Sequence, residues 1–150
     1  MFIFGLLAII LSIILFHKSL GKSAALLIAF FIALSPGIIS QSRFIWPPFV
    51  IAPLTVVFLY FIFQAYREKV MGIPLVFLIV GLMTHFEIAT SITLFISTVI
   101  TILIIRPKDI FKPKTIILSA ILLTATQVTL LLFDLRHNFL NMRGILGFVT

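Results

Sequence analysis

Long apolar runs separated by short polar breaks divide this chain from one end to the other. Runs of this length and uniformity predict helices that cross a membrane, because about 20 consecutive apolar residues span the hydrocarbon of a bilayer. The breaks carry all the Lys and Arg residues and two of the three His residues, His17 and His137, and one break also holds Trp46 and two prolines. The runs cover residues 2–16, 24–39, 49–66, 70–105 and 115–133.

The run over residues 70–105 is about twice as long as the others, and its only titratable residues are His85 and Glu87. One helix over this run would be about 54 Å long at 1.5 Å per residue, whereas the hydrocarbon layer is about 30 Å thick. We therefore expect two helices that meet near residues 85–87, although residues 84–90 contain no Gly or Pro to form the turn. The pattern then predicts six membrane spans, of which the first is short.

Composition supports a membrane protein and excludes other classes. Hydrophobic residues make up 62% of the chain and charged residues 10%, and the mean hydropathy is +1.33. A soluble domain carries about 25% charged residues, so a water-soluble globule is excluded. The absence of Cys excludes disulfides and thiolate metal sites. The prediction is an all-α membrane protein, one transmembrane helical domain over residues 1–150, with the lipid bilayer as its surroundings.

The net charge of +7 lies in short clusters between the apolar runs, which is typical of membrane topology and not of a nucleic-acid-binding surface. Three of the basic residues fall in one set of alternate loops: Arg43, Arg136 and Arg143. The other set holds eight: Lys18, Lys22, Arg67, Lys69, Arg106, Lys108, Lys112 and Lys114. Cytoplasmic loops carry the excess of Lys and Arg. The predicted location is the plasma membrane, with both termini and the loops that hold Arg43, His85, Glu87 and Asp134 outside.

The first apolar run begins at residue 2, and its lysines follow it. A secretory signal peptide has the opposite order of charge. We therefore interpret residues 2–16 as a true span that enters from outside. Such a start is typical of a piece of a longer protein.

His85 and Glu87 are the sharpest local indication of a site. Their helix starts at the cytoplasmic edge, which places the pair about 20 Å across the bilayer. Ionisable groups at that depth are costly unless they face a wet cavity or a partner. The alternative interpretation is a turn exposed at the outer surface, and the sequence leaves both open.

Two further groups of polar residues share predicted helix faces. A stripe of hydroxyls in the fifth span predicts a helix–helix contact: Thr90, Thr93, Ser97 and Thr101. A second face forms if the last helix continues past Phe133, with Arg136 and Arg143 beside it: Asp134, His137, Asn138 and Asn141. Arg can bind phosphate there while Asp and Asn orient a sugar. An ordinary polar helix end at the head-group level is the alternative.

Arg43 lies beside Trp46, a residue type that favours the membrane interface, and two prolines that suit the start of a helix. A turn at the membrane interface before the next helix explains this segment. Arg43 alone is a candidate for pairing with an anionic head group. The sequence contains no Walker A loop, no His-x-x-x-His pair and no Ser-His-Asp pattern. Chemistry based on soluble nucleotides therefore has no support.

Three elements of the chain, taken in order, resemble a known enzyme family. They are ALSP at residues 33–36 followed by Ser42-Arg43 and Trp46-x-Pro48, the GLxxHFE segment at residues 81–87, and FDLRHNFLN at residues 133–141. The chain resembles the bacterial branch of the dolichyl-phosphate-mannose–protein mannosyltransferases. These are C-type membrane glycosyltransferases, related to the lipid A aminoarabinose transferases. The string at residues 133–141 is the most specific of the three elements.

The resemblance implies transfer of a sugar from a polyprenyl-phosphate donor to an acceptor on the outer face of the membrane. Inverting transfer needs a carboxylate to take the acceptor proton and cations to stabilise the departing lipid phosphate. We expect Glu87, with His85, to line the cavity or assist a divalent metal, and Asp134 to orient Arg136. No other cofactor is expected. The predicted substrate-binding residues are Arg43, His85, Glu87, Asp134, Arg136, His137 and Asn138.

Family members begin with a further span and a large outer loop, whose acidic residue is thought to act as the general base. That region, the later spans and any C-terminal domain have no counterpart in these 150 residues. We therefore expect a fragment of the membrane core that lacks its base and is inactive by itself. The alternative is a non-catalytic polytopic membrane subunit or a small lipid or solute carrier. A carrier would favour an internal repeat, and none is visible.

Overall fold

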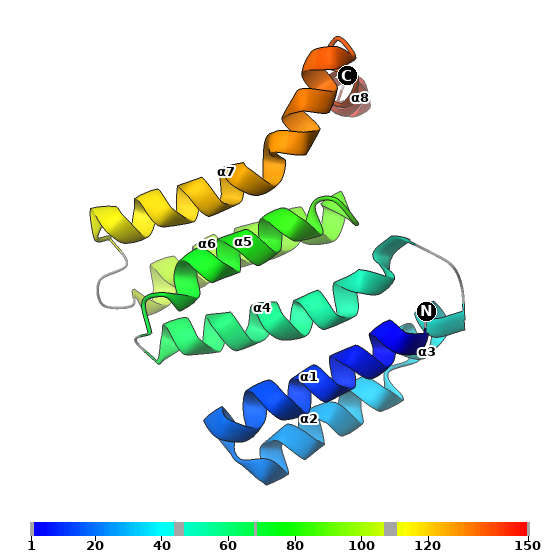
Figure 1. Ribbon diagram of the computed structural model, residues 1–150, viewed down its shortest axis with the longest axis vertical. Helices are drawn as coiled ribbons and strands as arrows, with labels where there is room; N and C mark the ends of the chain where they lie inside the picture. Colours follow the sequence, from blue (N-terminus) through cyan, green and yellow to red (C-terminus); the bar gives the residue numbers. More distant parts are fainter. Residues whose placement is uncertain (1, 44–46, 68, 107–110, 150) are drawn as a thin grey trace.

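The computed structural model describes residues 2–43, 47–67, 69–106 and 111–149, and every regular element in them is helical (Figure 1). The predicted all-α class is confirmed. The helices are α1 (Phe2–Leu20), α2 (Lys22–Leu34), α3 (Pro36–Arg43), the short 3₁₀ helix η1 (Pro47–Val50), α4 (Ile51–Tyr66), α5 (Gly72–Met83), α6 (Ile88–Ile105), α7 (Pro113–Arg136) and α8 (Leu140–Val149).

Three of these helices, α1, α6 and α7, are long and apolar enough to cross a membrane. Little of their surface is buried inside the fold, and large apolar side chains such as Phe2 and Ile104 are more than two-thirds exposed. Exposed apolar surface of this extent is stable against lipid and not against water. The other apolar helices are shorter, with 13 residues in α2, 16 in α4 and 12 in α5. Length and composition thus support a membrane protein with three candidate spans, where the sequence predicted six.

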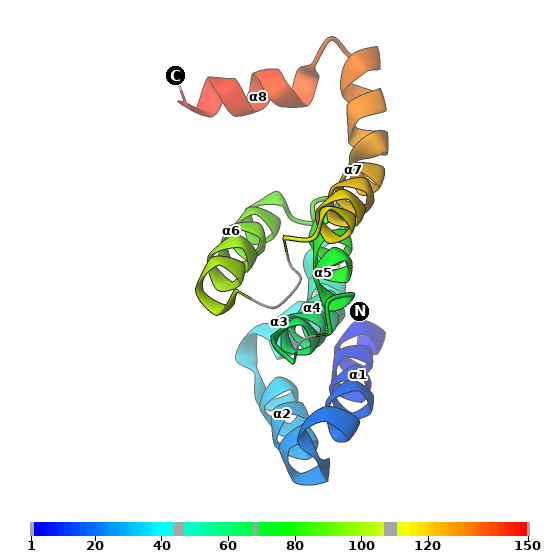
Figure 2. The ribbon, with the colours of Figure 1, turned by 90° about the vertical axis from the view of Figure 1, so that its left-hand side faces the viewer.

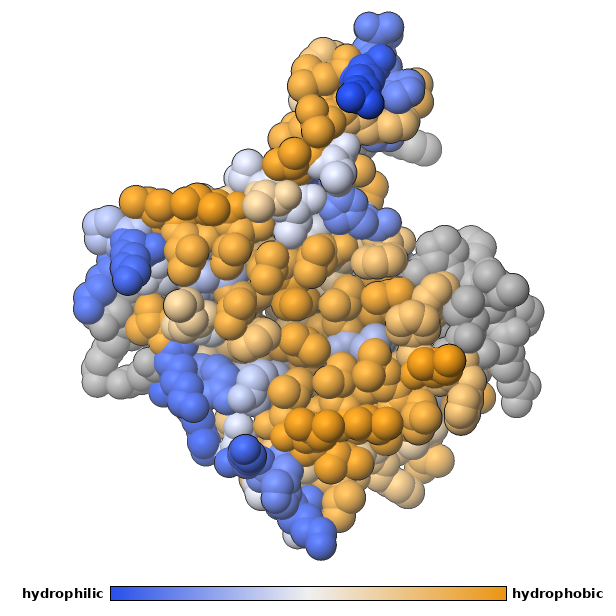
Figure 3. Space-filling view, in the orientation of Figure 1, coloured by the Kyte–Doolittle hydropathy of each residue, from blue (hydrophilic) through white to orange (hydrophobic). Residues whose placement is uncertain are grey.

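Helices α1, α2 and α4 to α7 run back and forth between two ends of the molecule (Figure 1). One end, which we name the basic end, holds the α1–α2, α4–α5 and α6–α7 connections. Its exposed cations are Lys18, Lys22, Arg67, Lys69, Arg106, Lys112 and Lys114. The α5–α6 turn and the start of α4 lie at the opposite end. Figure 3 shows hydrophilic residues gathered toward the basic end beside a broad apolar surface.

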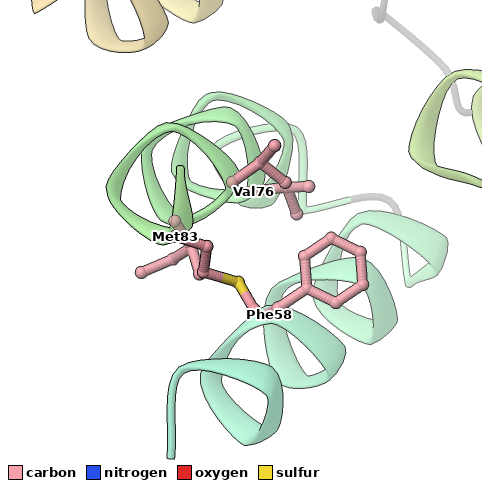
Figure 4. Close-up of a cluster of buried hydrophobic side chains, with 5 residues drawn as sticks. Phe58, Val76 and Met83 are labelled. Carbon is pink, nitrogen blue, oxygen red and sulfur yellow. The ribbon is translucent and has the colours of Figure 1, made fainter. Parts of the chain in front are cut away.

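Helix α5 is the centre of the packing, and it contacts α4, α6 and α7. Its side chains are apolar on all sides, as expected of a helix surrounded by others. Val76 and Met83 of α5 pack against Phe58 of α4 in the main core cluster (Figure 4). Helices α4 and α5 approach each other closely at Gly72, where a Cβ atom would lie 2.7 Å from the Phe61 carbonyl oxygen.

The break predicted within residues 70–105 is confirmed, because α5 ends at Met83 and α6 begins at Ile88. The turn forms without Gly or Pro, because two of its amides bond to the third preceding residue and not to the fourth. The His85 amide donates to the Leu82 carbonyl at 3.3 Å, and the Phe86 amide donates to the Met83 carbonyl at 3.0 Å. Bonds to the third preceding residue are typical of the tighter 3₁₀ turn that often ends an α-helix.

The apolar run over residues 24–39 does not form one helix. It is interrupted at Ser35, whose ψ of 117° is extended, and α3 then starts at Pro36. The cause is local, because the proline ring disfavours helical backbone at the residue before it.

The hydroxyl stripe predicted as a helix contact is not the most buried face of α6, since Thr90 and Thr101 at its ends are only half-buried. Thr93 and Ser97 are exposed, and each donates to a carbonyl of its own helix. Ser91 and Thr98 are buried in their place. The Ser91 Oγ donates to the Val80 carbonyl of α5 at 2.8 Å, which ties the two helices together.

The last long helix continues only three residues past Phe133, whereas the predicted polar face needed it to reach Asn141. Helix α7 ends at Arg136, and α8 leaves it in a new direction (Figure 2). Between them, Asn138 and Phe139 have φ values of 53° and 60°, in the left-handed region that ends a right-handed helix. Four residues predicted to share one helix face therefore do not share it: Asp134, His137, Asn138 and Asn141.

Candidate functional site

The α5–α6 turn brings His85 against the middle of α7. The exposed imidazole donates through Nε2 to the backbone carbonyl of Thr126, at 2.6 Å. A carbonyl oxygen only accepts, so Nε2 carries the proton in this arrangement. His85 is thus anchored to a backbone group of the longest helix in the described part of the chain.

A cluster of polar groups continues from His85 into the α5–α7 contact. The Gln127 Nε2 donates to the Gly81 carbonyl and to the Thr84 Oγ1, both at 3.0 Å. The Thr126 Oγ1 donates to the Leu123 carbonyl at 2.6 Å. A side chain at Gly81 would collide with the present position of the Thr126 side chain, so glycine favours the close approach of α5 and α7 there. We call Gly81, Thr84, His85, Thr126 and Gln127 the α5–α7 polar cluster.

Thr126 and Gln127 were not among the site residues predicted from the sequence. The signal that points to them is their position inside the apolar run at residues 115–133. Polar side chains at that depth are costly in hydrocarbon unless they face the interior of a bundle and find partners. In the structure, α5 supplies those partners.

Glu87 precedes the first residue of α6 and is half-buried. One of its carboxylate oxygens, Oε2, accepts a hydrogen bond from the Thr90 Oγ1 at 2.7 Å. Its backbone is extended, with φ −156° and ψ 108°, which sets the direction in which α6 leaves the turn. The carboxylate therefore lies against the first turn of its own helix.

A metal site would need more ligands than this turn supplies. Within the ranges that the structure describes, no three His, Cys, Asp or Glu side chains lie close enough to hold an ion. The His85 Nε2 is directed to a carbonyl, and the Glu87 carboxylate accepts from Thr90. A divalent metal at His85 and Glu87 stays a prediction.

The second group of predicted site residues forms the corner between α7 and α8. The Phe139 amide donates to the Asp134 backbone carbonyl at 2.7 Å, and the Asn141 amide donates to the Asp134 Oδ1 at 3.0 Å. A carboxylate bound to an amide in the first turn of a helix satisfies a donor that has no partner within the helix. Asp134 therefore shapes the corner through Asn141, and no ion pair links it to Arg136 in the described structure.

His137 is also held within the corner. Its Nδ1 donates to the Phe133 carbonyl at 2.8 Å, and its ring stacks on Phe133 with the ring centres 4.1 Å apart. Arg136, Asn138 and Arg143 are exposed. The corner thus presents two guanidinium groups beside a backbone whose shape is set by Asp134 and His137. Such groups can bind phosphate oxygens bidentately.

The structure brings the predicted residues together in two groups and not in one. Thr126, which binds His85, and Asp134 are eight residues apart on α7, a separation of about 12 Å along the axis. No hydrogen bond between the two groups is present among the described residues. The side chain of Arg43, at the end of α3, lies outside the described part of the structure. No known family model, curated protein or solved structure matches this chain.

Proposed function

We propose that this chain belongs to the membrane core of a glycosyltransferase that takes a sugar from a polyprenyl-phosphate donor and transfers it to an acceptor on the outer face of the membrane. The observation that carries the proposal is the FDLRHNFLN string at residues 133–141. This string forms the α7–α8 corner, which ends a candidate span that starts at the basic end.

The proposed orientation places the basic end in the cytoplasm. Seven of the eight cations counted for the cytoplasmic side are in the described structure, and all seven are exposed at that end. The α5–α6 turn lies at the opposite end (Figure 1). We count α2, α4 and α5 as spans along with the three longer helices, because they run between the same two ends, and so keep six spans in the proposal.

Arg136 is the proposed contact for the donor phosphate. It is exposed at the end of α7, next to a corner that Asp134 holds in shape through Asn141. A guanidinium held in a fixed orientation can donate two parallel hydrogen bonds to a phosphate. These bonds add binding energy that a nearby positive charge alone does not provide. His137 and Asn138 belong to the same corner and are proposed to contact the donor beside Arg136.

The carboxylates play supporting parts in this proposal. Asp134 binds the Asn141 amide, and Glu87 binds Thr90. Neither is assigned as the base. Glu87 and His85 are proposed to line the substrate cavity on the outer side, with Arg43 as a third group at that end.

The test is binding of a polyprenyl phosphate to the purified chain in detergent, with the unphosphorylated polyprenol as the comparison ligand. We expect Arg136→Ala to lower the affinity for the phosphate form at least about tenfold, because a charge-assisted hydrogen bond contributes about 1.5–3 kcal/mol. Arg136→Lys should restore only part of the loss. The matched control is Arg67→Ala, which removes an exposed arginine from the basic end.

If the parent and the Arg136→Lys protein bound the polyprenyl phosphate with equal affinity, bidentate binding by Arg136 would be contradicted. Arg136 would then be interpreted as an anchor at the membrane surface. Equal binding of the polyprenyl phosphate and the polyprenol would remove the basis for a donor site in this chain. The non-catalytic alternatives, an assembly subunit or a small carrier, would then be favoured.

A further inference from the structure

A cleft between α6 and α7 is a feature of the fold that the proposed function does not use. Both helices pack against α5 and have little contact with each other (Figure 2). The space left between them has a volume of about 340 Å³. Its lining includes Phe77 of α5, Phe95 and Leu103 of α6, and Ile116, Ala120 and Leu123 of α7.

The cleft presents hydrocarbon to whatever fills it. Among the described residues that line the cleft, the polar ones are Thr115 and Ser119, and the Ser119 Oγ donates to the Thr115 carbonyl of its own helix at 2.8 Å. Volumes of about 300–1,000 Å³ with apolar walls are typical of ligand pockets. The two helices that flank the cleft are both candidate spans, which favours a hydrocarbon chain of a lipid as its occupant.

The length of the cleft fits one acyl chain. Along α6 it extends from Phe95 to Leu103, and along α7 from Thr115 to Leu123. Each stretch rises about 12 Å at 1.5 Å per residue, and one leaflet contributes about 15 Å of the hydrocarbon layer. The cleft therefore covers most of one leaflet and ends near the middle of the bilayer.

The charge beside Leu103 and Thr115, at the basic end of the cleft, favours an anionic head group. Arg106 follows the lining residue Leu103 by one turn and donates through Nε to the Leu103 carbonyl at 3.2 Å. Lys114 directly precedes the lining residue Thr115, and both cations are exposed. In the sequence, residues 106–114 contain four cations and one carboxylate, Asp109. A cation near the membrane surface attracts anionic lipid by about 1 kcal/mol.

We infer that the α6–α7 cleft is a binding site for an anionic phospholipid. One acyl chain lies between the two helices, and the phosphate meets Arg106 and Lys114 at the basic end. This site lies at the opposite end of the molecule from the α5–α6 turn. It does not depend on sugar transfer, so either proposal can fail without the other.

Native mass spectrometry of the full chain in detergent tests the inference, with phosphatidylglycerol and phosphatidylcholine of identical acyl chains as probes. We expect at least about tenfold tighter binding of phosphatidylglycerol. Ala120→Phe fills the cleft and should abolish retention of this lipid. The matched control is Ala125→Phe, an exposed alanine of the same helix that does not line the cleft. Ala120→Leu serves as a milder filling variant if the phenylalanine disturbs folding.

The charge contribution has its own matched pair. Replacing Arg106 and Lys114 with Gln should remove the preference for phosphatidylglycerol, whereas replacing Lys18 and Lys22, at the same end but on α1 and α2, should leave it unchanged. Equal retention of both lipids by the parent would overturn the inference, as would equal losses in the Ala120 and Ala125 variants. If Ala120→Phe instead converted a dimer to a monomer with lipid retention intact, the occupant would be a second copy of the chain.

Discussion

At the residue scale, two glycines decide how closely α5 can approach its neighbours. At Gly72 a Cβ atom would meet backbone, 2.7 Å from the Phe61 oxygen and 2.9 Å from the Ala65 nitrogen. At Gly81 it would meet side chains: it would collide with the Thr126 Oγ1, with the Thr126 Cβ at 3.1 Å and the Leu123 Cδ1 at 3.2 Å. Side chains can rotate away, whereas the backbone of a packed helix cannot move without shifting the whole helix.

We therefore expect Gly72→Ala to destabilise the protein by about 2–3 kcal/mol and Gly81→Ala by less, within the usual cost of overpacking. Thermal unfolding in detergent micelles measures both. The matched control is Gly144→Ala, since nothing lies within 4 Å of a Cβ atom there. That change should stabilise α8 by up to about 1 kcal/mol. Equal melting temperatures for all three variants would contradict the α4–α5 and α5–α7 packing.

At the element scale, α7 consists of two parts that behave differently. It follows α5 as far as Thr126 and Gln127, which hydrogen bond with the α5–α6 region. Beyond them, most side chains are exposed, and the later part of the helix turns away from the bundle (Figure 1). Helix bends have local causes, among them a side chain that takes a carbonyl of the helix or a threonine bonded to its own backbone. The His85 and Thr126 hydrogen bonds supply both causes.

Loss of the His85 hydrogen bond should therefore change the direction of the later part of α7. The chain has no Cys, so spin labels can be placed at Ile88→Cys and Leu135→Cys, both exposed positions. Double electron–electron resonance should show His85→Phe shifting the distance between the labels by several ångströms. His17→Phe, on α1, is the matched control. An unchanged distance distribution in the His85 variant would mean that the bend has another cause.

At the scale of the whole molecule, the positions of the connections predict how the protein lies in the membrane. The basic end and the corner at Asn138 should face opposite sides of the bilayer, with the cations inside. In intact cells, Lys22→Cys and Lys112→Cys should resist an impermeant thiol reagent, and Asn138→Cys should react with it. Permeabilised cells provide the control, since all three should then label. Labelling of Lys112→Cys in intact cells would show the opposite orientation. It would also contradict the proposal that sugar transfer takes place on the outer face of the membrane.

The sequence by itself determined the helical class, the membrane character and the break near residues 85–87. These depend on local properties: the length of an apolar run, the scarcity of charge and the thickness of a bilayer. The interruption at Ser35 was also within reach, because Pro36 restricts the residue before it. The corner at Asn138 and Phe139 was not, since neither Gly nor Pro stands there.

Only the tertiary structure decided which residues meet. In α6 the buried face carries Ser91 and Thr98, and the stripe through Thr93 and Ser97 faces outward. In a helix that is apolar on every side, hydrophobicity does not distinguish the face toward protein from the face toward lipid. Close packing at small residues and hydrogen bonds between helices make that choice. Near the contact of His85 with Thr126, α5 and α7 likewise pack closely at a small residue, Gly81.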